Sequence, residues 1–178
     1  MKTAIVYASV HHGNTKKLVD AIADAYGTEL IDATKIKEKN LSEYDAIGFA
    51  SGIYYGKFHQ AVLNFASVNL PQEKTVFLIC THGGSAAFGS IEAILKNKRC
   101  SITDRFSCKG YDTFGPFRLI GGIAKGHPDD KDIRQCLIFM MVLLRKCRMG
   151  KILLYKSYYA IGESRCNKNP RINRGIGR

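Results

Sequence analysis

The chain has 178 residues, of which 46% are hydrophobic and 24% charged. This composition excludes the collagen, coiled-coil and disordered classes, and the length fits one globular domain with its own core. The net charge is +12, but it is unevenly spread: residues 1–133 carry 16 basic and 14 acidic residues, whereas residues 134–178 carry 11 basic residues and one acid. A nucleic-acid or membrane-surface role would therefore depend on the C-terminal part.

Membrane insertion and secretion have no support in the sequence. The longest apolar run has eight residues, 137–144, whereas a membrane-spanning helix needs about 20. The N-terminus lacks the apolar core of a secretion signal. The six cysteines form no C-x-x-C pair and no zinc-like spacing with histidine. These features predict a cytoplasmic protein without a membrane span and with reduced thiols rather than disulfides.

Short apolar runs alternate with segments of helical spacing. The apolar runs predict five strands, at residues 3–9, 29–33, 44–51, 74–81 and 105–109. Apolar residues three and four apart predict helices over 17–26, from 58 to 65, and over 86–95, and a last helix begins near 128. This rhythm predicts the α/β class: a doubly wound, five-stranded parallel sheet with helices on both faces.

Ligands of doubly wound sheets bind at the carboxyl ends of the strands, and three distinctive loops follow strands here. The first loop contains Ser9, Val10, His11, His12, Gly13, Asn14 and Thr15. Hydroxyl residues and a glycine at a helix N-terminus expose N–H groups where the helix dipole is positive, which suits a phosphate. A plain turn with a helix cap would show the same pattern. The loop is neither a Walker loop nor G-x-G-x-x-G, which argues against nucleoside triphosphates and Rossmann dinucleotides.

The second and third loops follow the third and fourth strands. The second contains Gly52, Ile53, Tyr54, Tyr55 and Gly56, and its aromatic pair suits stacking on a flat ring or plugging the sheet edge. The third contains Thr81, His82, Gly83 and Gly84, whose backbone either approaches a heteroaromatic edge or simply turns. Three such loops on one edge of the sheet are stronger evidence for a binding site than any one of them.

Metal binding and catalysis have little support. The five histidines have no clear set of carboxylates beside them, and the motif G-x-S-x-G is absent. We therefore predict neither a metal site nor a catalytic side chain.

Together these residues resemble the flavodoxin family. Residues 7–15 resemble its phosphate loop, S/T-x-T-G-N-T, lengthened by one residue and with two histidines in place of the usual hydroxyl. Residues 44–47 and 52–56 resemble its third strand and second loop, residues 81–84 resemble its third loop, and residues 110–117 resemble a small-flavodoxin subgroup. The resemblance covers about residues 2–133, which would form the domain, and implies the strand order 2-1-3-4-5.

The resemblance also implies a cofactor and a role. The family binds FMN without a covalent bond, so the first loop would hold the phosphate and the second and third would flank the isoalloxazine. The protein would carry electrons between redox partner proteins, and the flavin would supply the chemistry. An enzyme is the alternative, because residues 52–59 are also similar to menaquinone-dependent protoporphyrinogen dehydrogenase. Such an enzyme needs a substrate-binding insertion, for which residues 111–125 are the candidate.

The basic tail, residues 134–178, does not fit this family. The last helix becomes apolar on all sides over residues 136–144, unlike a surface helix, and a basic stretch without regular pattern follows. One permitted back-translation of residues 134–146, read in another frame, gives an amphipathic acidic segment. We therefore predict a reading-frame shift near residue 134, a poorly structured tail and a poorly covered sheet. A nucleic-acid-binding arm is the competing interpretation, against which the scattered basic residues argue.

Overall fold

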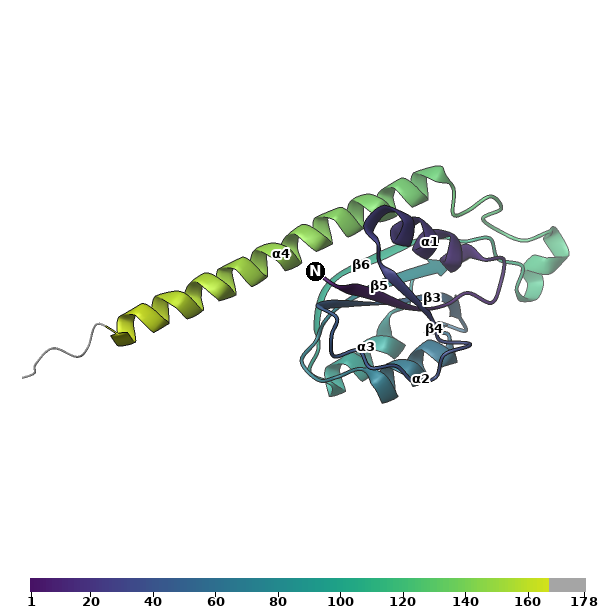
Figure 1. The fold of residues 1–178 in the computed structure, drawn as a ribbon. Helices are drawn as coiled ribbons and strands as arrows, with labels where there is room; N and C mark the ends of the chain where they lie inside the picture. The colour runs from purple at the N-terminus through teal and green to yellow at the C-terminus, as the bar shows by residue number, and fades with distance from the viewer. Residues whose placement is uncertain (167–178) are drawn as a thin grey trace, which may run out of the picture. The chain divides into compact units, whose positions relative to one another are not determined.

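The computed structural model describes residues 1–166, with side chains as far as Met149 except Pro116. The chain divides into two compact units, Met1–Leu143 and Leu144–Arg178. The first unit contains the sheet and every loop discussed above (Figure 1). The predicted domain boundary at residue 133 therefore falls ten residues before the end of this unit and inside its last helix.

The sheet has the predicted class and order. Five parallel strands lie in the order β2-β1-β3-β5-β6, which is 2-1-3-4-5 when only these five are counted. Their bounds are β1 Thr3–Ala8, β2 Glu29–Asp32, β3 Ala46–Tyr54, β5 Thr75–His82 and β6 Ser101–Lys109. All six residues of β1 are buried, as expected for a central strand covered on both faces. The structure contains one further strand that was not predicted: β4, Lys57–Phe58, is antiparallel to β3 and pairs with it.

Helices cover both faces of the sheet. The helices α2 (Gln60–Asn69) and α3 (Gly89–Asn97) lie on one face, and α1 (Asn14–Tyr26) lies on the other with the first part of α4 (Asp130–Cys166) (Figure 1). A short 3-10 helix, η1 (Gly115–Ile120), interrupts the long loop after β6. Within the described residues, no helix is long and apolar enough to cross a membrane.

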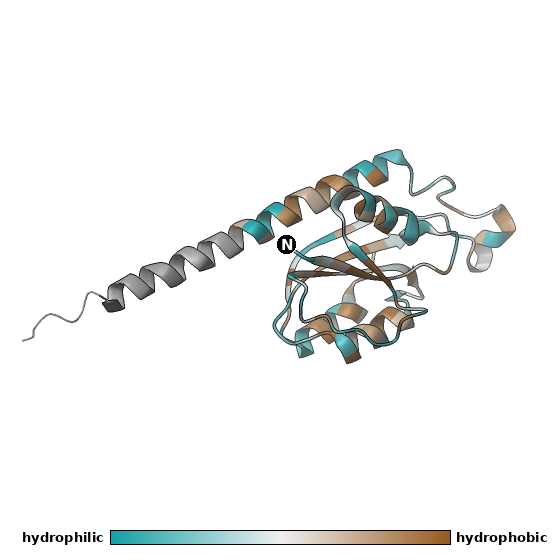
Figure 2. Ribbon diagram, in the orientation of Figure 1, coloured by the Kyte–Doolittle hydropathy of each residue, from teal (hydrophilic) through white to brown (hydrophobic). Residues whose placement is uncertain are grey.

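The first part of α4 packs closely on the sheet. Cys136, Met140 and Leu143 recur at helical spacing and are 1%, 0% and 0% exposed, and the Phe139 ring contacts Phe77 and Phe106 in the strands beneath. The same segment also exposes apolar residues, Ile138 at 57% and Val142 at 39%, and Figure 2 shows brown bands along this part of α4. One face of this uniformly apolar segment thus serves as the core face, so the expectation of a poorly covered sheet is wrong. The reading-frame shift stays a prediction, and residues 167–178 lie outside the described part.

Three buried thiols accompany this packing. Cys80 in β5 and Cys108 in β6 are buried, as is Cys136 in α4. The described cysteines with side chains form no disulfide. Removal of the thiolate from water raises the pKa of each of the three buried thiols.

Candidate functional site

A cavity of about 840 Å³ lies at the carboxyl ends of the parallel strands. Its volume is in the range of about 300–1,000 Å³ typical of cofactor pockets. All three predicted loops contribute to its wall. Ten of the predicted site residues line it: His11, His12, Asn14, Gly52, Ile53, Tyr54, Tyr55, Thr81, His82 and Gly83. The other six do not: Ser9, Val10, Gly13, Thr15, Gly56 and Gly84.

The first loop is shaped by two consecutive residues in left-handed conformation. His12 has φ +53° and Gly13 has φ +67°, and α1 begins at the next residue. The Ser9 hydroxyl accepts a hydrogen bond from Lys16 N–H at 3.1 Å. Ser9 therefore caps the start of α1 instead of facing the cavity. The left-handed pair turns the chain so that helix N–H groups face the loop, which is the local geometry of an anion site.

The first loop is tied to the other loops through polar side chains. The Thr15 and Thr81 hydroxyls, both buried, lie 2.9 Å apart and join the first loop to the third. His12 Nε2 lies 2.8 Å from the Thr113 hydroxyl, and the His12 ring lies 4.4 Å from the Tyr111 ring. The two predicted histidines therefore sit in the cavity wall, where imidazole N–H groups can add to the backbone donors of the loop.

The second loop is a β-hairpin, which corrects the sequence prediction. The strand β3 continues through Gly52, Ile53 and Tyr54 and pairs back with β4. Tyr55 and Gly56 form the two-residue turn with φ of +51° and +75°, as a type I′ turn requires. The turn leaves Tyr55 84% exposed at its tip.

Close packing explains the glycine that opens this hairpin. A Cβ on Gly52 would lie 2.9 Å from the Tyr54 hydroxyl oxygen, so the glycine makes room for the folded-back ring. Burial raises the pKa of Tyr54, which keeps the phenol neutral at ordinary pH. Tyr54 therefore offers the cavity a neutral aromatic wall.

The third loop also depends on a close approach. A Cβ on Gly83 would lie 2.5 Å from the Asp112 Cβ, so only glycine fits there. His82 Nδ1 lies 3.0 Å from the Gly84 carbonyl oxygen, and burial lowers the pKa of this imidazole. Lys109 Nζ donates to the carbonyls of Gly83 and Gly84 at 3.3 and 3.2 Å. These contacts hold the loop backbone at the cavity wall.

A fourth loop, residues 110–129 between β6 and α4, completes the wall and was absent from the predicted site. Its lining residues are Gly110, Tyr111, Asp112, Thr113, Phe114, Gly115 and Arg118. Asn14 Nδ2 donates to the Tyr111 carbonyl at 2.8 Å, and the Phe114 ring meets the Tyr55 ring edge-on at 4.9 Å. The sequence did contain a signal for this loop, because residues 110–117 resemble a small-flavodoxin subgroup. That resemblance was not used to place these residues in the site.

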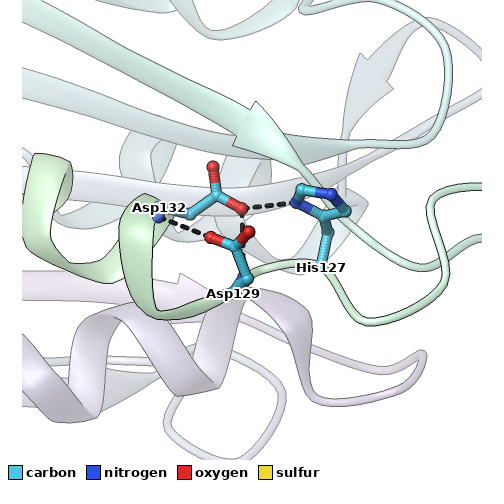
Figure 3. Close-up of side chains that lie close together, drawn as sticks. All are labelled: His127, Asp129 and Asp132. Atoms are coloured by element: carbon cyan, nitrogen blue, oxygen red, sulfur yellow. Dashed lines mark hydrogen bonds and ion pairs between the residues drawn. The ribbon is translucent and has the colours of Figure 1, made fainter.

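A cluster of potential metal-ligating atoms lies at the start of α4. One such atom from each of His127, Asp129 and Asp132 lies within 4.8 Å of the others (Figure 3). Asp132 N–H donates to the Asp129 carboxylate at 2.9 Å and Asp129 N–H to the Asp132 carboxylate at 3.0 Å. His127 Nδ1 lies 2.6 Å from the same Asp132 oxygen. This reciprocal pairing is a capping box at the start of α4, so its carboxylates satisfy the helix end.

Comparisons with known proteins agree with this fold. An uncharacterized protein of Methanocaldococcus jannaschii is 36% identical over 149 residues, which cover 82% of this chain and 99% of that protein. Among solved structures, a flavodoxin from the domain Archaea has a TM-score of 0.60 at 21% identity, covering 82% of this chain and 99% of that one. General stress protein 14 from Treponema denticola, solved in complex with FMN, has a TM-score of 0.58 at 12% identity, covering 80% and 99%.

These matches also locate the family within the chain. The matched share, 82% of 178 residues, is larger than 133 residues, so the match to the Methanocaldococcus jannaschii protein extends past the predicted domain boundary. A family model described as "Flavodoxin domain" matches residues 4–100, which is more than half of the chain. The fold, the loop cavity and the match to the family model together show that the chain belongs to the flavodoxin family.

Proposed function

We propose that the chain binds FMN in the cavity at the carboxyl edge of the sheet and carries electrons between redox partner proteins. The observation that carries the proposal is the position of Tyr55 and Phe114. Both rings belong to the cavity wall and yet are 84% and 56% exposed. A flat ring beside them would be reachable by a second protein.

The residues present fit the phosphate and ring of FMN. The N-terminus of α1 and the left-handed pair His12–Gly13 suit the phosphate, with the His12 side chain beside them. The aromatic walls from Tyr54 and Tyr111 suit the isoalloxazine. Bound FMN would supply the redox chemistry, and the protein would orient and shield it.

The enzyme alternative needs space for a large substrate beside the ring. Residues 111–125, the candidate insertion, fold back through paired hydrogen bonds between Asp112 and Ile123 and form part of the cavity wall. Phe114 contacts Tyr55 across two loops, and both rings belong to the cavity wall. This arrangement favours a carrier over an enzyme with a macrocyclic substrate, and turnover with a menaquinone analogue and protoporphyrinogen would reverse that preference.

A titration of the full chain with FMN tests cofactor binding at this site. We expect saturable quenching of flavin fluorescence, and binding of riboflavin at least about tenfold weaker, because riboflavin lacks the phosphate that the N-terminus of α1 would hold. Equal affinity for the two flavins would contradict the phosphate site, and no quenching by either would contradict the proposal.

Two glycines provide a matched test of the phosphate loop. Gly13 and Gly27 flank α1 with φ of +67° and +62°, and a Cβ on either would meet no atom within 4 Å. Gly13→Ala and Gly27→Ala should therefore each cost about 1 kcal/mol of stability through the same backbone strain. Only Gly13→Ala should weaken FMN binding, by about tenfold or more. Equal FMN affinity in the two variants, measured by the same titration, would exclude the first loop as the phosphate site.

The nucleic-acid alternative depends on the tail. Most of its basic residues lie beyond Met149, past the described side chains. That interpretation stays a prediction, and salt-dependent binding of a DNA duplex by the full chain is its test.

A further inference from the structure

A second, smaller cavity shares part of its wall with the first. Its volume is about 280 Å³, against about 840 Å³ for the first. Ligand pockets usually begin at about 300 Å³, so a space of this size suits part of a ligand rather than a whole one. Its lining comes from the first loop, the start of α1 and both ends of the fourth loop: His12, Gly13, Asn14, Lys17, Tyr111, Gly126, His127 and Pro128.

Three residues line both cavities and therefore form a partition between them: His12, Asn14 and Tyr111. His12 Nε2 lies 2.8 Å from the Thr113 hydroxyl, and the centres of the His12 and Tyr111 rings lie 4.4 Å apart. Asn14 Nδ2 donates to the Tyr111 carbonyl at 2.8 Å. These contacts join the first loop to the fourth and hold the His12 ring in the partition.

The second cavity suits an anionic group that accepts hydrogen bonds. Lys17 provides a cation, and its Nζ donates to the Pro128 carbonyl at 2.7 Å, which holds it at the cavity wall. His127 Nδ1 lies 2.6 Å from the Asp132 carboxylate, so Nε2 of the same ring is left for another partner. None of the described residues that line this cavity is acidic.

We propose that His12 makes the cofactor site specific for FMN over FAD by closing the passage from the first cavity into the second. The inference rests on the proposed function, because it concerns the phosphate end of the same site. FAD is FMN whose phosphate is joined through a diphosphate to adenosine, so FAD needs further space beyond that phosphate. The phosphate of FMN would lie at the N-terminus of α1, and Asn14, the first residue of α1, belongs to the partition.

The partition acts against the larger flavin and leaves the smaller one unaffected. With the His12 ring in place, the adenosine half of FAD has to turn into solvent and gains no contact with Lys17. With the ring removed, the second phosphate of FAD gains a path to that cation. Specificity is a difference between two affinities, and an obstacle to the unwanted ligand produces it as effectively as a contact with the preferred one.

The affinities of the full chain for FMN and FAD, measured by equilibrium dialysis, test this role. We expect the parent chain to bind FMN at least about tenfold more tightly than FAD, and His12→Gly to tighten FAD binding at least about fivefold. His12 is exposed and has φ +53°, which glycine adopts freely, so the variant should fold as the parent does. Equal affinities in the parent chain would overturn the proposal. A ratio that narrows only because FMN binding weakens would also overturn it.

The neighbouring histidine provides a matched control. His11→Ala and His12→Ala remove the same ring from adjacent positions, but His11 lines only the first cavity. We expect His12→Ala to tighten FAD binding as the glycine variant does, and His11→Ala to leave FAD binding unchanged or weaker. A similar gain of FAD affinity in both alanine variants would overturn the role of the partition.

Two adjacent lysines test where the additional half of FAD binds. Lys17 lines the second cavity, whereas Lys16 pairs with Asp20 on α1 and lines neither cavity. In the His12→Gly chain, Lys17→Ala should weaken FAD binding about threefold or more, and Lys16→Ala less than about twofold. Equal effects of the two lysines would overturn the proposal. FMN binding by the parent chain without a gain of FAD affinity in His12→Gly would overturn only the role of His12, whereas no FMN binding by the parent chain would overturn the proposed function as well.

Discussion

Gly48→Val is expected to remove at least about 3 kcal/mol of folding free energy, a large part of the stability of a domain of this size. Gly48 lies in the centre of β3, and a Cβ there would come within 2.5 Å of the Phe77 ring and 2.9 Å of Ile5 Cγ1. Both of these side chains are 0% exposed. Because β3 is paired on both sides, the backbone cannot move away without breaking a ladder.

Urea denaturation of the Gly48→Val variant measures this effect, and the Gly89→Ala variant is its control. A Cβ on Gly89, at the start of α3, would meet no atom within 4 Å. Alanine is also a better helix former than glycine, so the Gly89 variant should be unchanged or slightly more stable. A Gly48→Val midpoint equal to that of the parent chain would show that the sheet is packed differently there.

Met140→Ala is expected to cost about 2–4 kcal/mol, because it leaves a cavity between α4 and the sheet. Met140 is 0% exposed, whereas Ile138, two residues earlier in the same helix, is 57% exposed. Ile138→Ala should therefore cost less than about 1 kcal/mol. Thermal or urea unfolding of the two variants gives the comparison, and similar costs would mean that α4 does not pack through this face.

The packing of α4 also bears on the reading-frame hypothesis. Cys136, Met140 and Leu143 are buried at helical spacing, and the match to the Methanocaldococcus jannaschii protein extends past residue 133. Both observations weigh against a shift at residue 134. The hypothesis stays a prediction with a direct test, because a gene without an insertion or deletion near codon 134, relative to its close relatives, would refute it.

The sheet could be predicted because each of its long strands has a recognisable local sequence pattern. Buried parallel strands are continuous apolar runs, and β1, β2 and β5 differ from their predicted ranges by at most one residue at an end. The hairpin at β4 could not be predicted in this way. Its turn is Tyr55–Gly56, without the asparagine or aspartate that signals a two-residue turn, and β4 has only two residues.

Three loops of the site could be predicted because each follows a strand and carries a local motif. The fourth loop could not, because what places it in the wall is contact between distant residues. Asn14 and Tyr111 are 97 residues apart in the chain and are joined by one hydrogen bond. Asp112 and Ile123 likewise form a bridge within a segment that has no strand pattern. Such pairings depend on tertiary structure, which local periodicity does not encode.

The buried cysteines allow local opening of the folded chain to be measured through the rate of thiol modification. Burial raises the pKa of Cys80 and Cys136 to about 12, so at pH 8 nearly all of each thiol is protonated and unreactive. Thiol–disulfide reagents should therefore modify these two positions only when the surrounding structure separates. Cys136 would record detachment of α4 from the sheet, and Cys80 would record opening around β5. Comparing the two rates in one sample would show whether the domain loosens helix by helix or all at once.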